Sequence, residues 1–258
     1  MADILYAERD ACAFVTLNRP TRRNALTRAM LAELTELFTR LSARRDLRAV
    51  VLTGAGTAAF SAGTDIAELA ALDEAAARAA AERGQAACEA IELCGVPVVA
   101  AVNGAAVGGG CELALACHLR VVAAHASFAL PELKLGLIPA YGGTQSLARA
   151  IGRGRALAAL LAGDAIAADE ALRLGLANRV VAVEQLWSET EALVQTLAAQ
   201  APLAARACLA AVTRGARLPL AAGLQLEAEL FSQLFNSADV REGTRAFLEK
   251  RAPEFKGV

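Results

Sequence analysis

The sequence has almost no net charge, and it lacks the terminal features that direct a chain to another compartment. Its 258 residues carry 26 Lys or Arg against 27 Asp or Glu, a formal net charge of −1. This balance gives no reason to expect nucleic acid as a partner. Residues 1–10 lack the basic and apolar regions of a secretory signal and the Arg- and Ser-rich character of a transit peptide. We therefore expect a cytoplasmic location.

Patterned cysteine and histidine are also missing. The six cysteines form no C-x-x-C pair, and the two histidines, His118 and His125, have no spacing suited to zinc. Neither a G-x-S-x-G nucleophile motif nor a G-x-x-x-x-G-K-[ST] phosphate loop occurs. We expect reduced and mostly buried cysteines, structural histidines, and no metal or redox cofactor.

One apolar stretch, residues 96–117, raises the question of a membrane span. Four glycines, a proline, an asparagine and a glutamate within it would place helix-breaking and ionisable groups near mid-bilayer. No cluster of Lys or Arg flanks it to set an orientation. Since 56% of the chain is apolar, we assign the stretch to the core of a compact protein and expect no membrane partner.

The same stretch contains a strand followed by a glycine-rich turn. The run 97–102 is apolar and largely β-branched, which is typical of a parallel strand buried on both faces. Asn103-Gly104 ends this strand with turn chemistry. Gly108–Gly110 then allow a ligand to approach the backbone closely, just before a helix predicted over 111–117.

Two glutamates accompany this turn. Glu112 lies in the first turn of the predicted helix, where free backbone N–H groups favour a developing oxyanion. Glu132 follows Pro131 at the end of a short strand. Taken alone, each glutamate would be expected to be a solvated surface residue. An apolar setting beside a glycine or proline turn favours a role in acid–base chemistry instead.

Hydrophobic periodicity predicts alternating strands and helices, followed by a mostly helical region. The predicted strands cover 3–8, 12–18, 47–53, 97–102, 119–123 and 126–129, and a short segment at 178–181 interrupts the later helices. The predicted helices cover 25–41, 73–94, 111–117, 144–151, 153–162, 168–175, 184–200, 202–214, 218–235 and 238–250. The alternation of strands and helices in the first half of the chain therefore predicts a wound α/β sheet.

The segment 54–59 fits a loose dinucleotide-binding fingerprint. A helix should open there, and a strand ending in an acidic residue should follow about 20 residues later. Neither is predicted, since the next residues are Phe60-Ser-Ala-Gly and an alanine-rich helix. We reject a nucleotide cofactor on this ground.

Several motifs resemble those of the enoyl-CoA hydratase/isomerase (crotonase) superfamily, in the expected order over nearly the whole chain. They are residues 17–26 (LNRPTRRNAL), 60–66 (FSAGTDI), 101–112 (AVNGAAVGGGCE), 128–145 (FALPELKLGLIPAYGGTQ) and 241–251 (REGTRAFLEKR). The resemblance implies an α/β spiral of β-β-α units over residues 1–198, with the CoA and active sites. It also implies a helical trimerisation region over 199–258, in a homotrimer or homohexamer.

The resemblance further implies an enzyme of fatty acid metabolism, a hydro-lyase that adds water to a 2-enoyl-CoA to give a 3-hydroxyacyl-CoA. CoA is then part of the substrate and not a cofactor. The chief alternative is a double-bond isomerase or another acyl-CoA enzyme of the family, since an isomerase can operate with one glutamate. A silent CoA or RNA binder is disfavoured by the two glutamates and by the lack of a Lys- and Arg-rich face.

Residue by residue, the resemblance makes Glu112 and Glu132 the catalytic pair and the main-chain N–H groups of Thr64 and Gly109 the oxyanion hole. Thr64 replaces a more usual alanine, and Leu130 departs from the residue commonly found before Pro-Glu. The implied CoA or substrate contacts are Arg23, Ala25, Ala62, Gly63, Asp65, Ile66, Tyr141 and Phe247.

The two glutamates are expected to have different roles, one as a base and the other as an acid. The helix dipole should keep Glu112 ionised, which suits a water-activating base. The apolar setting of Glu132 should raise its pKa, which suits a proton donor.

Overall fold

A computed structural model describes residues 2–258, whose strands form two sheets. The larger sheet has the order β1-β2-β3-β5-β7-β10; β1 and β2 are antiparallel, and the later neighbours are parallel. Its strands are β1 (Ile4–Arg9), β2 (Cys12–Leu17), β3 (Ala49–Gly54), β5 (Val98–Val102), β7 (Leu119–Ala123) and β10 (Arg179–Val181). The five strands predicted for β1, β2, β3, β5 and β7 are confirmed, with ends that differ by at most about two residues. The segment 178–181, predicted only to interrupt the helices, contains β10.

The smaller sheet has the order β4-β6-β8-β9. Its strands are β4 (Ala59–Ser61), β6 (Ala105–Val107), β8 (Ser127–Ala129) and β9 (Ile166–Ala167), and the first three are parallel. The sequence predicted β8 but not the others. Strands this short carry too few side chains to show an alternating pattern, so periodicity could not reveal them.

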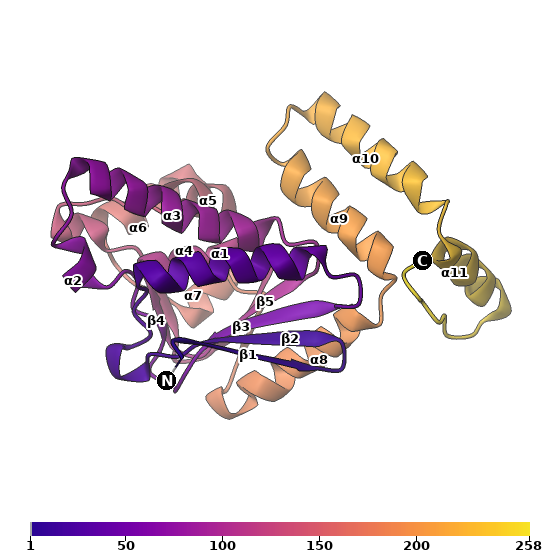
Figure 1. The fold of residues 1–258 in the computed structure, drawn as a ribbon, viewed down its shortest axis with the longest axis horizontal. Helices are drawn as coiled ribbons and strands as arrows, with labels where there is room; N and C mark the ends of the chain where they lie inside the picture. The colour runs from indigo at the N-terminus through magenta and orange to yellow at the C-terminus, as the bar shows by residue number, and fades with distance from the viewer. Residues whose placement is uncertain (1) are drawn as a thin grey trace.

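Two long helices pack side by side on one face of the larger sheet, and one covers the opposite face. Figure 1 shows α1 (Arg28–Ala43) and α3 (Glu74–Glu92) above the sheet and α8 (Leu186–Ala198) below it. α1 begins three residues later than predicted, because the Thr27 side chain caps the helix by accepting a hydrogen bond from the Met30 N–H.

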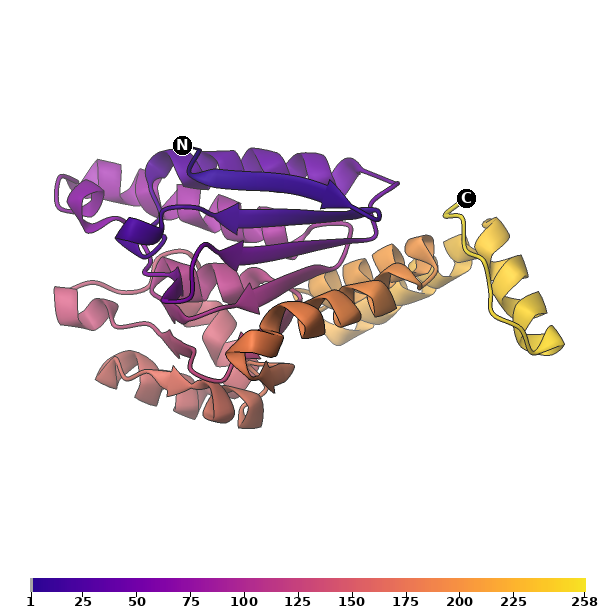
Figure 2. The same cartoon turned by 90° about the horizontal axis from the view of Figure 1, so that it is seen from below.

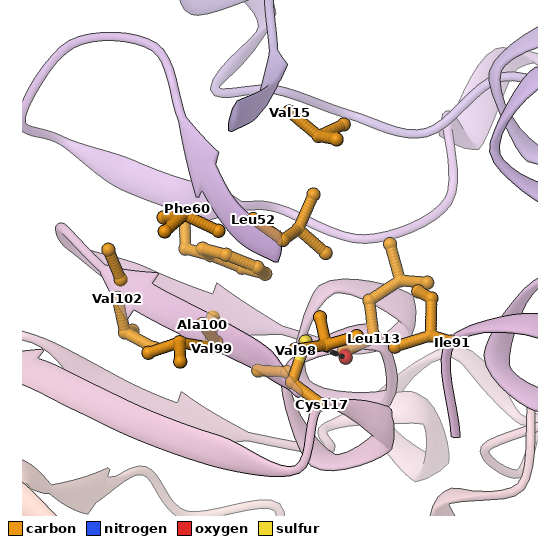
Figure 3. Packing of buried hydrophobic residues seen from close by; sticks show 14 of the residues in the cluster. Val15, Leu52, Phe60, Ile91, Val98, Val99, Ala100, Val102, Leu113 and Cys117 are labelled. Atoms are coloured by element: carbon orange, nitrogen blue, oxygen red, sulfur yellow. Dashed lines mark hydrogen bonds between the residues drawn. The ribbon is translucent and has the colours of Figure 1, made fainter. Parts of the chain in front are cut away.

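The buried core follows the predicted apolar run. Every residue of β5 is buried, and Figure 3 shows Val98 of this strand beside Leu113 of α4 (Gly109–Ala116). Five of the six cysteines are buried and free, as predicted: Cys12, Cys88, Cys94, Cys111 and Cys117. Within residues 2–258, no helix has both the length and the apolar character needed to cross a membrane.

The remaining helices complete the core or extend from it. The short helices are η1 (Pro20–Arg22), α2 (Ile66–Leu69), η2 (Glu132–Leu135) and η3 (Val183–Gln185). α5 (Gly143–Ile151), α6 (Arg153–Ala162) and α7 (Ala168–Arg173) belong to the core region, followed by α9 (Pro202–Gly215), α10 (Leu220–Leu234) and α11 (Ala238–Glu249). Figures 1 and 2 show α9, α10 and α11 projecting away from the sheets.

Asn103 ties the ends of two central strands together. Its Nδ2 donates to Gly54 O at 2.8 Å and to Gly56 O at 2.6 Å, and its Oδ1 accepts from Gly54 N at 3.2 Å. The side chain is buried. It therefore satisfies backbone groups that water cannot reach.

We predict that Asn103→Ala lowers the free energy of unfolding by about 3 kcal/mol, since several buried backbone groups lose their partner. Urea denaturation would measure the change. Gln185→Ala, at an exposed position outside residues 199–258, serves as the control and should change stability by less than about 0.5 kcal/mol. Equal effects of the two substitutions would contradict this account.

Candidate active site

The ends of three short parallel strands bring the predicted site together. β4, β6 and β8 are neighbours in the smaller sheet and run in the same direction. Gly63-Thr64 follows β4, Gly108-Gly109 follows β6, and Glu132 follows β8. Because the carboxyl ends of parallel strands meet at one edge of a sheet, three segments distant in sequence become neighbours.

The loops after β4 and β6 touch through their backbones. A Cβ placed on Gly63 would lie 2.7 Å from Val107 O and 3.1 Å from Gly109 N. Gly63 has φ +86° and Gly108 has φ +54°, conformations that L side chains rarely adopt. Glycine at these positions therefore allows the Gly109 amide to lie close to the one that follows Gly63.

The two amides predicted as the oxyanion hole are free donors. Among residues 2–258, neither the Thr64 N–H nor the Gly109 N–H donates a hydrogen bond. Leu26 pairs with the neighbours of Thr64 instead, by donating to Gly63 O at 2.7 Å and accepting from Asp65 N at 2.8 Å. Gly109 is the first residue of α4, so the positive end of the helix dipole adds to its N–H.

Glu112 is buried on the first turn of α4, and its carboxylate is held in place. Its Oε1 accepts hydrogen bonds from Tyr141 N at 2.8 Å and from Gly143 N at 2.7 Å. Burial raises the pKa of Glu112 to about 7, against the lowering effect of these hydrogen bonds. The sequence led us to expect a carboxylate kept ionised by the helix dipole, whereas burial raises the pKa of Glu112 above its usual range.

Glu132 begins η2 and faces the same region. Its Oε1 lies 3.0 Å from where a Cβ on Gly108 would be, and its Oε2 is buried without a hydrogen-bond partner among the described residues. Burial raises the pKa of Glu132, as the sequence predicted. The charge of Glu132 also contributes to the raised pKa of Glu112, so the two carboxylates share one electrostatic environment.

Tyr141, predicted as a substrate contact, borders the same amides. Its hydroxyl lies 2.7 Å from Thr64 Oγ1, and its ring edge lies against Gly109, where an added Cβ would be 2.6 Å from the ring Cε2. The other edge of the ring fits over Gly84 of α3, where a side chain would overlap it. Only 6% of Tyr141 is exposed.

The two loops predicted to contact CoA are tied to each other. Arg19 Nη1 donates to Ala25 O at 2.7 Å and to Asp65 Oδ2 at 2.9 Å, which lowers the pKa of Asp65. Ala62 N donates to Arg23 O at 2.9 Å. The structure thus brings these predicted residues together at one rim of the site.

Three residues that hold this rim were not identified from the sequence. They are Arg19, Asn24 and Ser61. Asn24 Nδ2 donates to Ala55 O at 3.0 Å and to Ala59 O at 2.9 Å, and Ser61 Oγ donates to Asn24 O at 2.8 Å. The motif 17–26 contained the first two, but their role depends on partners that are distant in sequence. Ile66 starts α2 beside them and is 56% exposed.

Other predicted residues lie elsewhere. Phe247 is 83% exposed on α11. Figures 1 and 2 show α11 on the opposite side of the molecule from α2 and β4. It does not join the site within its own chain.

His118 accepts a hydrogen bond from Val98 N and contacts Glu92 O through its second ring nitrogen, and His125 contacts Thr57 O. Both histidines hold the backbone, as predicted. No group of three or more possible metal ligands occurs within residues 2–258.

Comparison with known proteins agrees with this geometry. The sequence model of the family described as enoyl-CoA hydratase/isomerase matches residues 7–258. The chain is 36% identical over 252 residues to the short-chain-enoyl-CoA hydratase of Clostridium acetobutylicum, with 98% of this chain and 97% of that protein covered. It is 38% identical over 253 residues to the crotonyl-CoA hydratase of Syntrophomonas wolfei, at coverages of 98% and 97%.

A solved structure extends the likeness to the whole fold. The crystal structure of an enoyl-CoA hydratase from Bacillus anthracis matches with a TM-score of 0.95 and 38% identity, and 100% of each chain is covered. This match confirms the predicted α/β spiral with C-terminal helices. The chain therefore belongs to the enoyl-CoA hydratase/isomerase (crotonase) superfamily.

Proposed function

We propose that the chain hydrates a 2-enoyl-CoA thioester to the 3-hydroxyacyl-CoA. The observation that carries this proposal is the presence of buried Glu112 and half-buried Glu132 beside two unpaired backbone N–H groups. Relatives named as enoyl-CoA hydratases support the same activity. A double-bond isomerase is the second candidate, since a single glutamate can move a proton between carbons.

In the proposed reaction, the thioester oxygen accepts hydrogen bonds from Thr64 N–H and Gly109 N–H. Water adds to C3 and the C2=C3 electron pair moves to C2, so negative charge develops on that oxygen. The proton lost by water passes to one glutamate, and C2 takes a proton from the other. No metal or redox group is required, because one water molecule is added without change of overall oxidation state.

We assign Glu112 as the base and Glu132 as the acid. The pKa of Glu112, about 7, is close to the value that makes a general base most effective near neutral pH. One oxygen of Glu112 accepts two backbone N–H groups, which leaves the other oxygen for water. The unpartnered Oε2 of Glu132 suits a protonated oxygen whose acceptor is the substrate.

Glu112→Gln and Glu132→Gln should each lower kcat by at least about 100-fold with little change in KM, the scale of a lost general acid or base. Glutamine keeps the acceptor oxygen used by Tyr141 N and Gly143 N, so the fold should persist. Loss of enoyl-thioester absorbance with crotonyl-CoA would report the rate. Exposed Glu184→Gln is the matched control. Near-normal hydration by Glu112→Gln would refute the two-glutamate mechanism.

The pH dependence of kcat/KM should reflect the raised pKa of Glu112. Only the ionised carboxylate accepts a proton, so kcat/KM should fall as the pH drops below about 7. Glu132 must be protonated to act as the acid, so ionisation of its carboxyl group should also lower kcat/KM. Rates across the range from about pH 5 to pH 9 would show the fall on the acidic side. A constant kcat/KM down to pH 5 would exclude Glu112 as the base.

We also propose that residues 199–258 form a helical oligomerisation region and that the chain assembles as a homotrimer or homohexamer. The helices that project from the core expose large apolar side chains: Val212, Leu220, Leu224, Phe231, Phe235, Phe247 and Leu248. Apolar side chains gathered on projecting helices are typical of a subunit interface. An adjacent subunit would then provide the CoA site to which Phe247 is assigned.

Light scattering at micromolar concentration should therefore give three or six times the subunit mass of 26.6 kDa. Phe231→Glu and Leu224→Glu place charges on α10 and should shift the mass toward one subunit. Glu82→Lys, on the exposed side of α3, is the control. A mass of one subunit for the unchanged chain would refute the proposed assembly.

A further inference from the structure

A mostly apolar cavity of about 760 Å³ lies directly behind Glu112 and Tyr141. Side chains from α4, α5, α8 and α9 line it, among them Leu115, Leu197 and Leu209. Thr64, Gly109 and Glu132 are not among its lining residues. Glu112 and Tyr141 therefore face the cavity on one side and the oxyanion hole on the other.

The Tyr141 ring occupies the boundary between the two spaces. It spans from Gly84 on α3 to Gly109 at the start of α4, and its hydroxyl is hydrogen-bonded to Thr64. Three separate elements thus hold the ring in one position. Burial raises the pKa of Tyr141, so the phenol stays neutral at physiological pH and places no charge at this boundary.

The direction of the acyl chain follows from the site. The proposed CoA loops lie on the side of Ala62 and Asp65, and the reacting carbons must lie near both carboxylates. The Tyr141 ring lies against Gly109, and both Glu112 and Tyr141 line the cavity, so an acyl chain that continues past Glu112 toward the cavity meets the ring. A longer chain needs space that the ring now fills.

We propose that Tyr141 is a specificity-determining residue that closes the passage from the oxyanion hole to the apolar cavity and so restricts the substrate to short acyl chains. This inference rests on the proposed acyl-CoA activity and adds the substrate class. Removal of the ring would join the two spaces. The cavity would then accept the methylene groups of a longer acyl chain.

The test compares kcat/KM for trans-2-decenoyl-CoA with kcat/KM for crotonyl-CoA in three proteins. The unchanged chain should favour crotonyl-CoA. Tyr141→Ala keeps the backbone N–H that holds Glu112 and should raise the decenoyl-to-crotonyl ratio at least about tenfold, since each buried methylene strengthens binding by about fourfold. Tyr141→Phe keeps the ring and removes only the hydroxyl, so its ratio should stay within about threefold of the unchanged chain.

Folding is checked by circular dichroism and by a cooperative thermal unfolding transition. Tyr141→Leu, which leaves a smaller void, is measured beside Tyr141→Ala and should show a smaller rise in the ratio. A folded Tyr141→Ala or Tyr141→Leu protein with an unchanged ratio would overturn the proposal. So would an unchanged chain that already hydrates decenoyl-CoA as efficiently as crotonyl-CoA.

A binding measurement separates this inference from the proposed function. If no enoyl-CoA is hydrated, the hydratase proposal fails. Calorimetry with saturated butyryl-CoA and decanoyl-CoA still tests whether Tyr141 closes the passage to the cavity. Tyr141→Ala should then strengthen binding of decanoyl-CoA relative to butyryl-CoA at least about tenfold, and Tyr141→Phe should not. Equal ratios in both variants would show that the ring sets no chain-length limit.

Discussion

The close approach of two backbones, at Gly63 and at Gly108–Gly109, is the constraint on which the rest of the site depends. An added Cβ at Gly63 would meet Val107 O at 2.7 Å, so any other residue would push the two loops apart. Their separation decides whether two amides can serve one oxygen atom. Parallel strands β4, β6 and β8 bring the loops to one edge, and positive φ angles at both glycines allow the final contact.

The burial that makes these amides effective donors also changes the acids beside them. Water is excluded around Glu112, which strengthens hydrogen bonds but makes a bare carboxylate costly. The two N–H groups that reach Glu112 offset part of that cost, and its pKa settles at about 7. Glu132 has a raised pKa and no partner for Oε2. A single physical condition, loss of solvation, thus raises the pKa of both carboxyl groups.

Tyr141 connects this chemistry with the shape of the site. Its backbone N–H positions Glu112, while its side chain fills the space between Gly84 and Gly109 and contacts Thr64. The aromatic ring fits only because both positions beneath it are glycines. Thr64 and Tyr141, read separately in the sequence, form one hydrogen-bonded pair in the structure.

The sequence by itself determined the order of the long elements, the buried strand at 98–102, the helix start at Gly109 within two residues, and the two glutamates as candidates. These follow from local patterns: apolar runs, helical periodicity and glycine clusters. Only the tertiary structure revealed β4 and β6, because strands of three residues have no periodicity. It alone decided the pKa of Glu112, the contacts of Arg19 and Asn24, and the position of the Tyr141 ring. Each of these depends on contacts between segments distant in sequence, and solvation and packing are properties of the assembled fold.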